Sequence, residues 1–125
     1  MKDLSVIVII LLLVFVPGYY SEIYLKKSGE EIVNMLEKVE EEVKFGNMDN
    51  FNKVEEIKKK WEKEQELWNI LSNHQNTDDV QKNIEIMLAN YENKEADDVL
   101  ANIAEIRFIL EDVPKGEKIR IVNIF

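Results

Sequence analysis

The chain contains no cysteine among its 125 residues and only one histidine, His74. The absence of cysteine excludes disulfides, thiolate nucleophiles and thiolate metal sites. One histidine cannot supply the several imidazoles that usually hold a catalytic zinc ion. The four glycines stand far apart, so the chain has no glycine-rich loop that could cradle a phosphate group. We therefore expect no enzymatic activity, no catalytic residue, no cofactor and no metal site.

Basic residues are also scarce, because 16 Lys and Arg stand against 25 Asp and Glu, for a net charge of −9. Affinity for nucleic acid depends on the neutralisation of phosphates by Lys and Arg, so we expect no nucleic-acid partner. Acidic pairs such as Asp78-Asp79 diverge by about 100° on a helix. They are therefore expected at helix caps and on solvated faces, and not as converging catalytic carboxylates.

Apolar residues are concentrated at the start of the chain. Residues 4–16 form an unbroken run without charge, and the uncharged stretch continues to Tyr20. As a helix, residues 4–20 would span about 25 Å, slightly less than the hydrocarbon core of about 30 Å. Tyr19 and Tyr20 stand where an interfacial aromatic belt is expected, and Lys2 can reach head groups at the other end. We predict an amino-terminal transmembrane anchor or signal segment in residues 1–21 and a helical domain in residues 22–125.

The apolar segment has two interpretations. A run of this length also fits a cleaved signal peptide, with Pro17-Gly18 ending its helix. No A-x-A-like cleavage site is present and bulky tyrosines come directly after Gly18, so we prefer an uncleaved anchor. Lys2 and Lys26-Lys27 nearly balance the positive charge on the two sides of the segment. We expect a single-pass protein of the cell membrane with its helical domain outside the cytoplasm, because short amino-terminal anchors usually export the domain attached to them; the alternative is a secreted protein.

From Ser28 onward the apolar residues recur every three or four positions, which predicts amphipathic helices. Ser28 and Glu31 match a capping box, and Gly46-Asn47 is typical of a helix end, so we predict a first helix between them that can also run on from the apolar segment. The predicted inward positions of the four successive helices are Ile32, Met35, Leu36, Val39 and Val43; Phe51, Val54, Ile57, Trp61, Trp68 and Leu71; Val80, Ile84, Met87, Leu88 and Tyr91; and Ala96, Val99, Leu100, Ile103, Ile106 and Leu110.

The boundaries of the other helices are predicted from capping and turn residues. Asp49 or Asn50 is predicted to cap the second helix, and Thr77 or Asp78 the third. Asn93-Lys94 separates the third helix from the fourth. The remaining boundary residues are Pro114 and Gly116, which mark the predicted end of the fourth helix.

The fold class is therefore all-α. We predict a hydrophobic amino-terminal helix followed by about four antiparallel amphipathic helices, arranged as a bundle or as stacked hairpins. Residues 118–125 alternate polar and β-branched side chains, which predicts a short extended carboxy-terminal tail. No second strand is predicted, so this tail is expected to lie across the helices.

Four residues are candidates for contact with a partner. Trp61 and Trp68 are seven positions apart on one helix face, where they fit the core and, if exposed, would be hot spots for a partner. His74 falls at the border of that face, and Asn73 lies beside it in a polar stretch, which also fits a helix end. Glu64 interrupts the apolar stripe, and we expect its side chain to extend to solvent; the alternative is a buried carboxylate with a partner.

Residues Trp61, 68–74 (Trp-Asn-Ile-Leu-Ser-Asn-His), Asp78-Asp79 and the closing 123–125 (Asn-Ile-Phe) resemble the domain of unknown function 4363 family over essentially the whole chain. This is a family of short proteins from Gram-positive, often spore-forming bacteria. The resemblance implies a membrane-associated helical protein. It implies no activity, cofactor or catalytic residue, because none is established for the family.

We expect a non-enzymatic, membrane-anchored helical protein that acts as an interaction or accessory subunit for another membrane or envelope protein. The alternative is an extracytoplasmic sensor that binds a small molecule or cation between its helices. A third hypothesis is a hydrolase that uses His74 with a carboxylate. The sequence does not identify the partner, the ligand or the oligomeric state.

Overall fold

The computed structural model describes residues 2–124, in which it has four α-helices and no strand. The helices are α1 (Lys2–Lys44), α2 (Phe51–Leu71), α3 (His74–Glu92) and α4 (Ala96–Ile124). The side chains of residues 2, 16–19, 21–22 and 114–124 lie outside the description. The predictions made for the side chains of Tyr19 and of residues 123–125 therefore lie outside the described residues, whereas the all-α class is confirmed.

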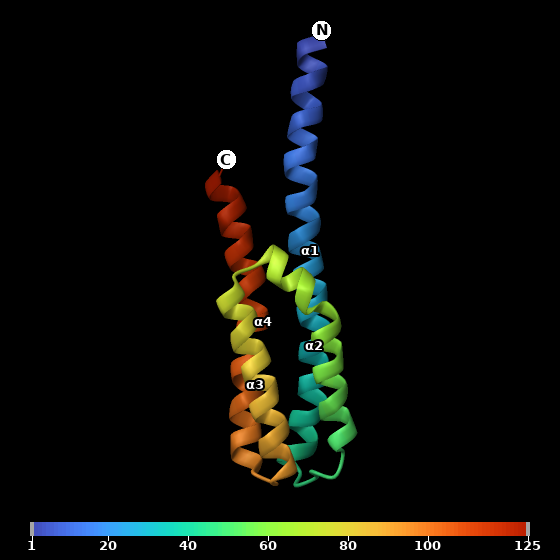
Figure 1. Cartoon of the computed structure of the whole chain (residues 1–125), viewed down its shortest axis with the longest axis vertical. Coiled ribbons are helices and arrows are strands. Elements are labelled where there is room, and N and C mark those ends of the chain that lie inside the picture. Colours follow the sequence, from blue (N-terminus) through green and yellow to red (C-terminus); the bar gives the residue numbers. More distant parts are fainter. Residues whose placement is uncertain (1, 125) are drawn as a thin grey trace.

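The four helices form a bundle in which each helix packs against two neighbours. The packed pairs are α1 with α2, α2 with α3, α3 with α4, and α4 with α1. In Figure 1 successive helices run in opposite directions, and the α1–α2 and α3–α4 connections share one end of the bundle. The α2–α3 connection crosses the other end, where α1 and α4 both continue beyond it. We call this second end the proximal end and the first the distal end.

The core lies between these helices and consists mainly of the predicted apolar stripes. Trp61 and Trp68 are almost completely buried, with ring centroids 5.8 Å apart and planes tilted by 53°. Each helix contributes residues three and four positions apart, as amphipathic helices do when they share a core. The buried predicted positions are Ile32, Leu36, Val39, Val43, Val54, Ile57, Trp61, Trp68, Val80, Ile84, Met87, Tyr91, Val99, Ile103, Ile106 and Leu110. The other predicted positions are partly buried against this cluster.

The two connections at the distal end have the same backbone geometry. Gly46 has φ of 82°, and the amides of Gly46 and Asn47 bond the carbonyls of Val43 and Glu42. This is a Schellman motif, in which a left-handed residue lets two amides cap the last carbonyls of a helix. Lys94 repeats the arrangement at the end of α3 with φ of 60°. The predicted stops at Gly46-Asn47 and Asn93-Lys94 are therefore confirmed.

The capping box predicted at Ser28 is wrong. α1 is continuous from Lys2 to Lys44 through Pro17-Gly18 and Ser28, so the helix runs on from the apolar segment. The amides of residues 28–31 then have partners within the helix, and a side-chain cap is needed only where a helix begins. The Ser28 hydroxyl bonds to side chains of α2 instead.

The predicted start of α3 is also wrong, because Asn73 and not Thr77 or Asp78 is its cap. The Asn73 Oδ1 accepts a hydrogen bond from the Gln75 amide at 2.8 Å. Thr77 is buried within the helix, and its hydroxyl donates to the Asn73 carbonyl at 3.2 Å. The stretch 73–77 contains no Gly or Pro, so nothing in it stops the helix from beginning at the first capping residue.

The predicted start of α2 is confirmed, since Asn50 occupies its cap position, although its side chain makes no capping hydrogen bond. The Asn50 Nδ2 donates to Glu42 on α1 instead.

The extended carboxy-terminal tail is wrong too. α4 runs from Ala96 to Ile124 and passes through Pro114 and Gly116 as a helix. An isolated strand leaves its backbone donors and acceptors without partners, whereas a helix satisfies them within the segment. The two-residue alternation at 118–124 therefore does not decide the conformation, because the described chain offers no second strand.

Candidate functional site

The apolar segment of α1 projects from the proximal end of the bundle (Figure 1). Every large apolar side chain from Leu4 to Phe15 is between 45% and 68% exposed. Among the described side chains of α1, the first that is fully buried is Leu25, which marks where the helix enters the bundle. Transfer of an aliphatic side chain out of water is favourable by about 1.5–3 kcal/mol, so this segment favours an apolar environment. Among the side chains that the structure describes, however, no helix provides an apolar stretch of sufficient length to cross a membrane.

One turn inside the bundle, α1 approaches both of its neighbours closely at Ser28 and Gly29. A Cβ atom on Gly29 would lie 3.1 Å from the carbonyl oxygen of Leu110 on α4 and 3.7 Å from the Trp68 ring. The Trp68 Nε1 donates a hydrogen bond of 2.8 Å to the Ser28 Oγ. The small residues Ser28 and Gly29 thus let α1, α2 and α4 meet just below the apolar segment.

The Ser28 hydroxyl also donates to Glu64, which joins it to a charged cluster. The Glu64 carboxylate lies 2.9 Å from the Lys60 Nζ, and Lys60 lies 2.8 Å from the Glu31 carboxylate. Ser28 and Glu31 belong to α1, whereas Lys60, Glu64 and Trp68 belong to α2. The cluster therefore links the helix that carries the apolar segment to its neighbour, and Glu64 is the paired carboxylate and not a residue extended to solvent.

The electrostatics of this cluster depend on its contacts. The hydrogen bond and charge of Lys60 hold the pKa of Glu31 below its usual range. Hydrogen bonds to Glu31 and then Glu64 raise the pKa of Lys60. Burial, and next the charge of Glu64, raise the pKa of Tyr24, while a hydrogen bond with Ser28 opposes the change. These shifts favour the ionised forms of Lys60 and Glu31. At neutral pH the two side chains therefore form an ion pair that links α2 to α1.

The structure separates the four predicted partner-contact residues into two groups. Trp61 and Trp68 are core residues, with their rings packed on one another and almost no surface exposed. In this arrangement neither ring is available to a partner. Asn73 and His74 are exposed, Asn73 as the N-cap of α3 and His74 as its first residue. The connection that they follow crosses the proximal end of the bundle (Figure 1). The burial of Trp68 brings it to Ser28, a contact that no helical periodicity in the sequence signals.

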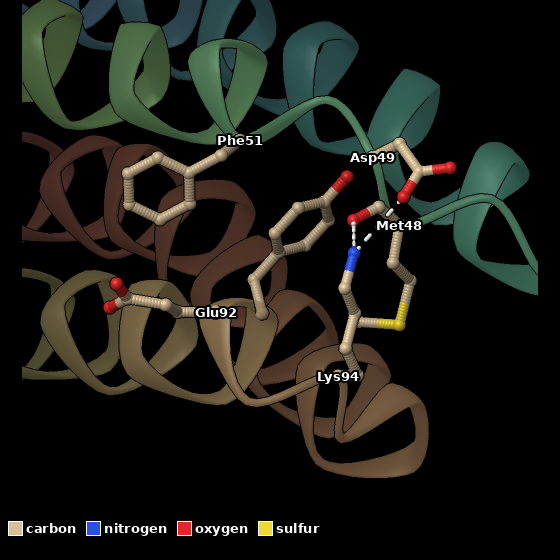
Figure 2. Close-up of a pocket in the computed structure, with 6 residues that line it drawn as sticks. Met48, Asp49, Phe51, Glu92 and Lys94 are labelled. Atoms are coloured by element: carbon tan, nitrogen blue, oxygen red, sulfur yellow. Dashed lines mark hydrogen bonds and ion pairs between the residues drawn. The ribbon is translucent and has the colours of Figure 1, made fainter.

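A pocket of about 310 Å³ lies at the distal end, lined by Met48, Asp49, Phe51, Tyr91, Glu92 and Lys94. Figure 2 shows Lys94 directed at the Met48 carbonyl and the Asp49 carboxylate. The Tyr91 hydroxyl accepts a hydrogen bond from the Asn50 amide at 3.0 Å. The Lys94 ammonium in the pocket is therefore already paired, and the Tyr91 hydroxyl is bonded to backbone. The partly exposed ring of Phe51 is left as the main apolar surface of the pocket.

In the part of the chain that the structure describes, no group of three or more His, Asp or Glu side chains is placed to hold a metal ion. His74 begins α3 and is exposed. Salt bridges of the described residues involve Lys, Arg, Asp and Glu and do not include His74. The described arrangement thus does not pair His74 with a carboxylate as the hydrolase hypothesis requires.

Comparison with known protein families finds a match that covers most of the chain. The family described as "Domain of unknown function (DUF4363)" matches residues 19–124. The chain belongs to this family. The match covers all four helices except the first part of α1, so the DUF4363 domain comprises the bundle and its entry point, and the apolar run at 4–16 precedes it. No curated protein and no solved structure matches the chain.

Proposed function

We propose that this DUF4363 protein is a non-enzymatic accessory subunit, held at the membrane by residues 4–20 and presenting its helical bundle to another membrane or envelope protein. One observation carries the proposal. The aliphatic side chains between Leu4 and Phe15 are exposed on every side of α1, beyond the point where the bundle begins. A helix that is apolar all round needs a surrounding apolar phase, and a lipid bilayer supplies it.

The placement of the bundle outside the cytoplasm is part of this proposal.

Residues 4–20 extend over about 25 Å, so a single pass requires local thinning of the bilayer or a continuation into the next turn of α1. The unbroken helix from Lys2 to Lys44 supports such a continuation. A secreted form that lacks the apolar segment is the alternative.

The non-enzymatic role is supported by the chemistry of the described side chains. In the cluster at the entry of α1, the polar groups of Ser28, Glu31, Lys60 and Glu64 bond to one another across α1 and α2 and stabilise the packing. Glu64 is mostly buried, and its two oxygens are taken by Ser28 and Lys60. A carboxylate so occupied is suited to holding helices together, and the rest of the bundle surface remains for a partner.

The test is fractionation of cells that produce the full chain, compared with the variant Leu11→Glu. A charge at the centre of a membrane helix disfavours insertion by about 2.5–3.5 kcal/mol. We expect the native chain in the carbonate-resistant membrane fraction and a substantial loss of the variant from it. Phe45→Glu is the matched control, because Phe45 is equally apolar and 84% exposed but lies at the distal end. Equal recovery of all three chains in the soluble fraction would overturn the proposal.

A sensor remains the second candidate, and the distal pocket is the observation that favours it. Its volume of about 310 Å³ and its mixed apolar and charged lining suit a small organic molecule. Thermal-shift measurements with a metabolite and cation set test this function. Stabilisation that disappears in Phe51→Ala would support it, and no stabilisation by any compound would remove it.

A further inference from the structure

We propose that the α2–α3 elbow, defined as residues 67–77, docks on the lipid surface and fixes the tilt of the bundle against the membrane. The inference rests on the proposed membrane attachment and extends it to a second contact. The occupant of this surface is the boundary between head groups and acyl chains, where exposed apolar side chains are buried and uncharged polar groups stay hydrated.

The first observation is the composition of the elbow. Residues 67–77 contain no Asp, Glu, Lys or Arg, although these types make up 33% of the chain. The uncharged stretch is bounded by Glu66 on α2 and Asp78 on α3, both exposed. Uncharged polar residues and aliphatic residues are suited to the interface, whereas charged groups are costly to move out of water.

The second observation is the exposure of apolar side chains at this elbow. Ile70 is 75% exposed and Leu67 is 45% exposed, in contrast to the neighbouring Trp68, which is buried. On α1, Ile23 and Tyr20 are also exposed at the same end. Exposed apolar residues thus continue from the apolar segment onto α2, so that the elbow extends the surface that the membrane is proposed to cover.

The third observation is the position of Ile70 along the long axis of the bundle, relative to the residues of α1. Ser28 contacts both Glu64 and Trp68, and α2 runs antiparallel to α1, so Ile70 is level with about residue 24 of α1. Residues 4–20 are about 5 Å short of a typical hydrocarbon core, a deficit of about three residues. The hydrocarbon boundary therefore falls close to Ile23 and Ile70.

The basic residues beyond this level fit the same boundary. Lys26 and Lys27 are exposed one turn further into the bundle, where their ammonium groups reach phosphates. Glu22 falls at the boundary, and its side chain lies outside the described residues. Figure 1 shows that the elbow crosses the end from which α1 projects, and that α4 also continues beyond it. Contact of the elbow with lipid therefore brings the last turns of α4 to the membrane as well.

The experiment uses the absence of cysteine, since any single Cys variant then carries one nitroxide label. Full-length Leu11→Cys, Ile70→Cys, Phe45→Cys and Phe108→Cys chains are reconstituted in vesicles of phosphatidylcholine and phosphatidylglycerol. Power-saturation EPR compares collision of each label with oxygen, which concentrates in lipid, and with a water-soluble nickel chelate. Phe45 and Phe108 are matched controls, because both are exposed apolar residues away from the elbow.

The inference predicts a deep label at position 11 and an interfacial label at position 70, with nickel collisions about twofold or more below those at 45 and 108. A deep label at 11 with position 70 as accessible to nickel as both controls would overturn the docking of the elbow and leave the attachment standing. A water-exposed label at 11 would overturn the proposed attachment, and the elbow inference with it.

Discussion

The indole nitrogen of Trp68 on α2 donates a 2.8 Å hydrogen bond to the hydroxyl of Ser28 on α1. Both side chains are buried, and the hydroxyl donates its own proton in a hydrogen bond to Glu64. The bond lies one turn below the point where α1 leaves the bundle. The bond therefore links α1, the helix that carries the apolar segment, to the Trp68 side chain in the core. Mutation of this pair tests the packing of α1 against α2.

Removal of the Ser28 hydroxyl leaves the Trp68 donor buried without a partner. Ser28→Ala is expected to lower the free energy of unfolding by about 1–3 kcal/mol. A double-mutant cycle with Trp68→Phe, measured by chemical denaturation, isolates the pair from the loss of packing. We expect a coupling energy of about 0.5–1.5 kcal/mol, whereas effects that add to within about 0.3 kcal/mol would contradict the contact.

A methyl group on Gly29 would press on the backbone of α4. Gly29→Ala gains about 0.5–1 kcal/mol of helix propensity, but its Cβ would meet the Leu110 carbonyl oxygen at 3.1 Å. A backbone carbonyl moves aside less easily than a flexible side chain. We therefore expect the steric cost to exceed the gain in helix propensity, so that Gly29→Ala lowers the free energy of unfolding by about 0.5–2 kcal/mol. Asn34→Ala is the matched control on the exposed face of α1, where stability should rise slightly. A stabilised Gly29→Ala would contradict the close approach.

The ion pair of Lys60 with Glu31 contributes to the dependence of stability on pH. The lowered pKa of Glu31 gives a stabilisation that is complete above the ordinary value of 4.5 and is lost as the pH falls through the folded-state value. The raised pKa of Lys60 gives a stabilisation that is complete below its ordinary value of 10.5 and is lost only as the pH rises through the folded-state value. We therefore expect the Tm to fall on acidification.

The variant Lys60→Gln removes the cause of the shift in Glu31, so it should flatten this fall in Tm between about pH 6 and about pH 3. Lys59→Gln changes the same charge at an exposed neighbouring position and should keep the native slope. Identical slopes in the two variants would show that the Lys60 cluster does not contribute.

Lys94 has a left-handed backbone that favours glycine. Its side chain compensates by bonding the Met48 carbonyl and Asp49, which ties the α3–α4 connection to the α1–α2 connection. Lys94→Ala loses those bonds and keeps the strain, whereas Lys94→Gly loses the bonds and relieves it. We expect Lys94→Gly to unfold with a free energy about 1 kcal/mol higher than Lys94→Ala. Equal stabilities of the two variants would argue against the left-handed conformation.

Periodicity predicts the core well because it is a local property of an amphipathic helix. The stripe from Val54 to Trp68 and the stripe from Val99 to Leu110 are both buried as expected. The stop at Gly46 is also predictable, since the glycine that a left-handed residue favours stands in the sequence. The stop at Asn93-Lys94 is found at the predicted place, although its left-handed residue is Lys94 and not a glycine.

The errors have a common cause, which is that the same residue types serve different purposes in different surroundings. Ser28 resembles a cap but is an interhelical hydrogen-bond partner, because α1 begins much earlier. Glu64 resembles a solvated residue but is paired, because Ser28 and Lys60 come from positions that only the fold brings together. Contacts between helices are not visible in the spacing along one helix, so the candidate site could not be assembled from sequence.

The central claim is that the apolar segment remains on the chain and holds the bundle at the membrane. The most direct measurement is the intact mass of the native protein extracted from the membrane fraction of its own cells. We predict in that fraction a mass that includes the apolar segment, which is 14.7 kDa for the 125 residues. A shorter chain that begins near Tyr19 and is recovered free in the culture medium would contradict the account.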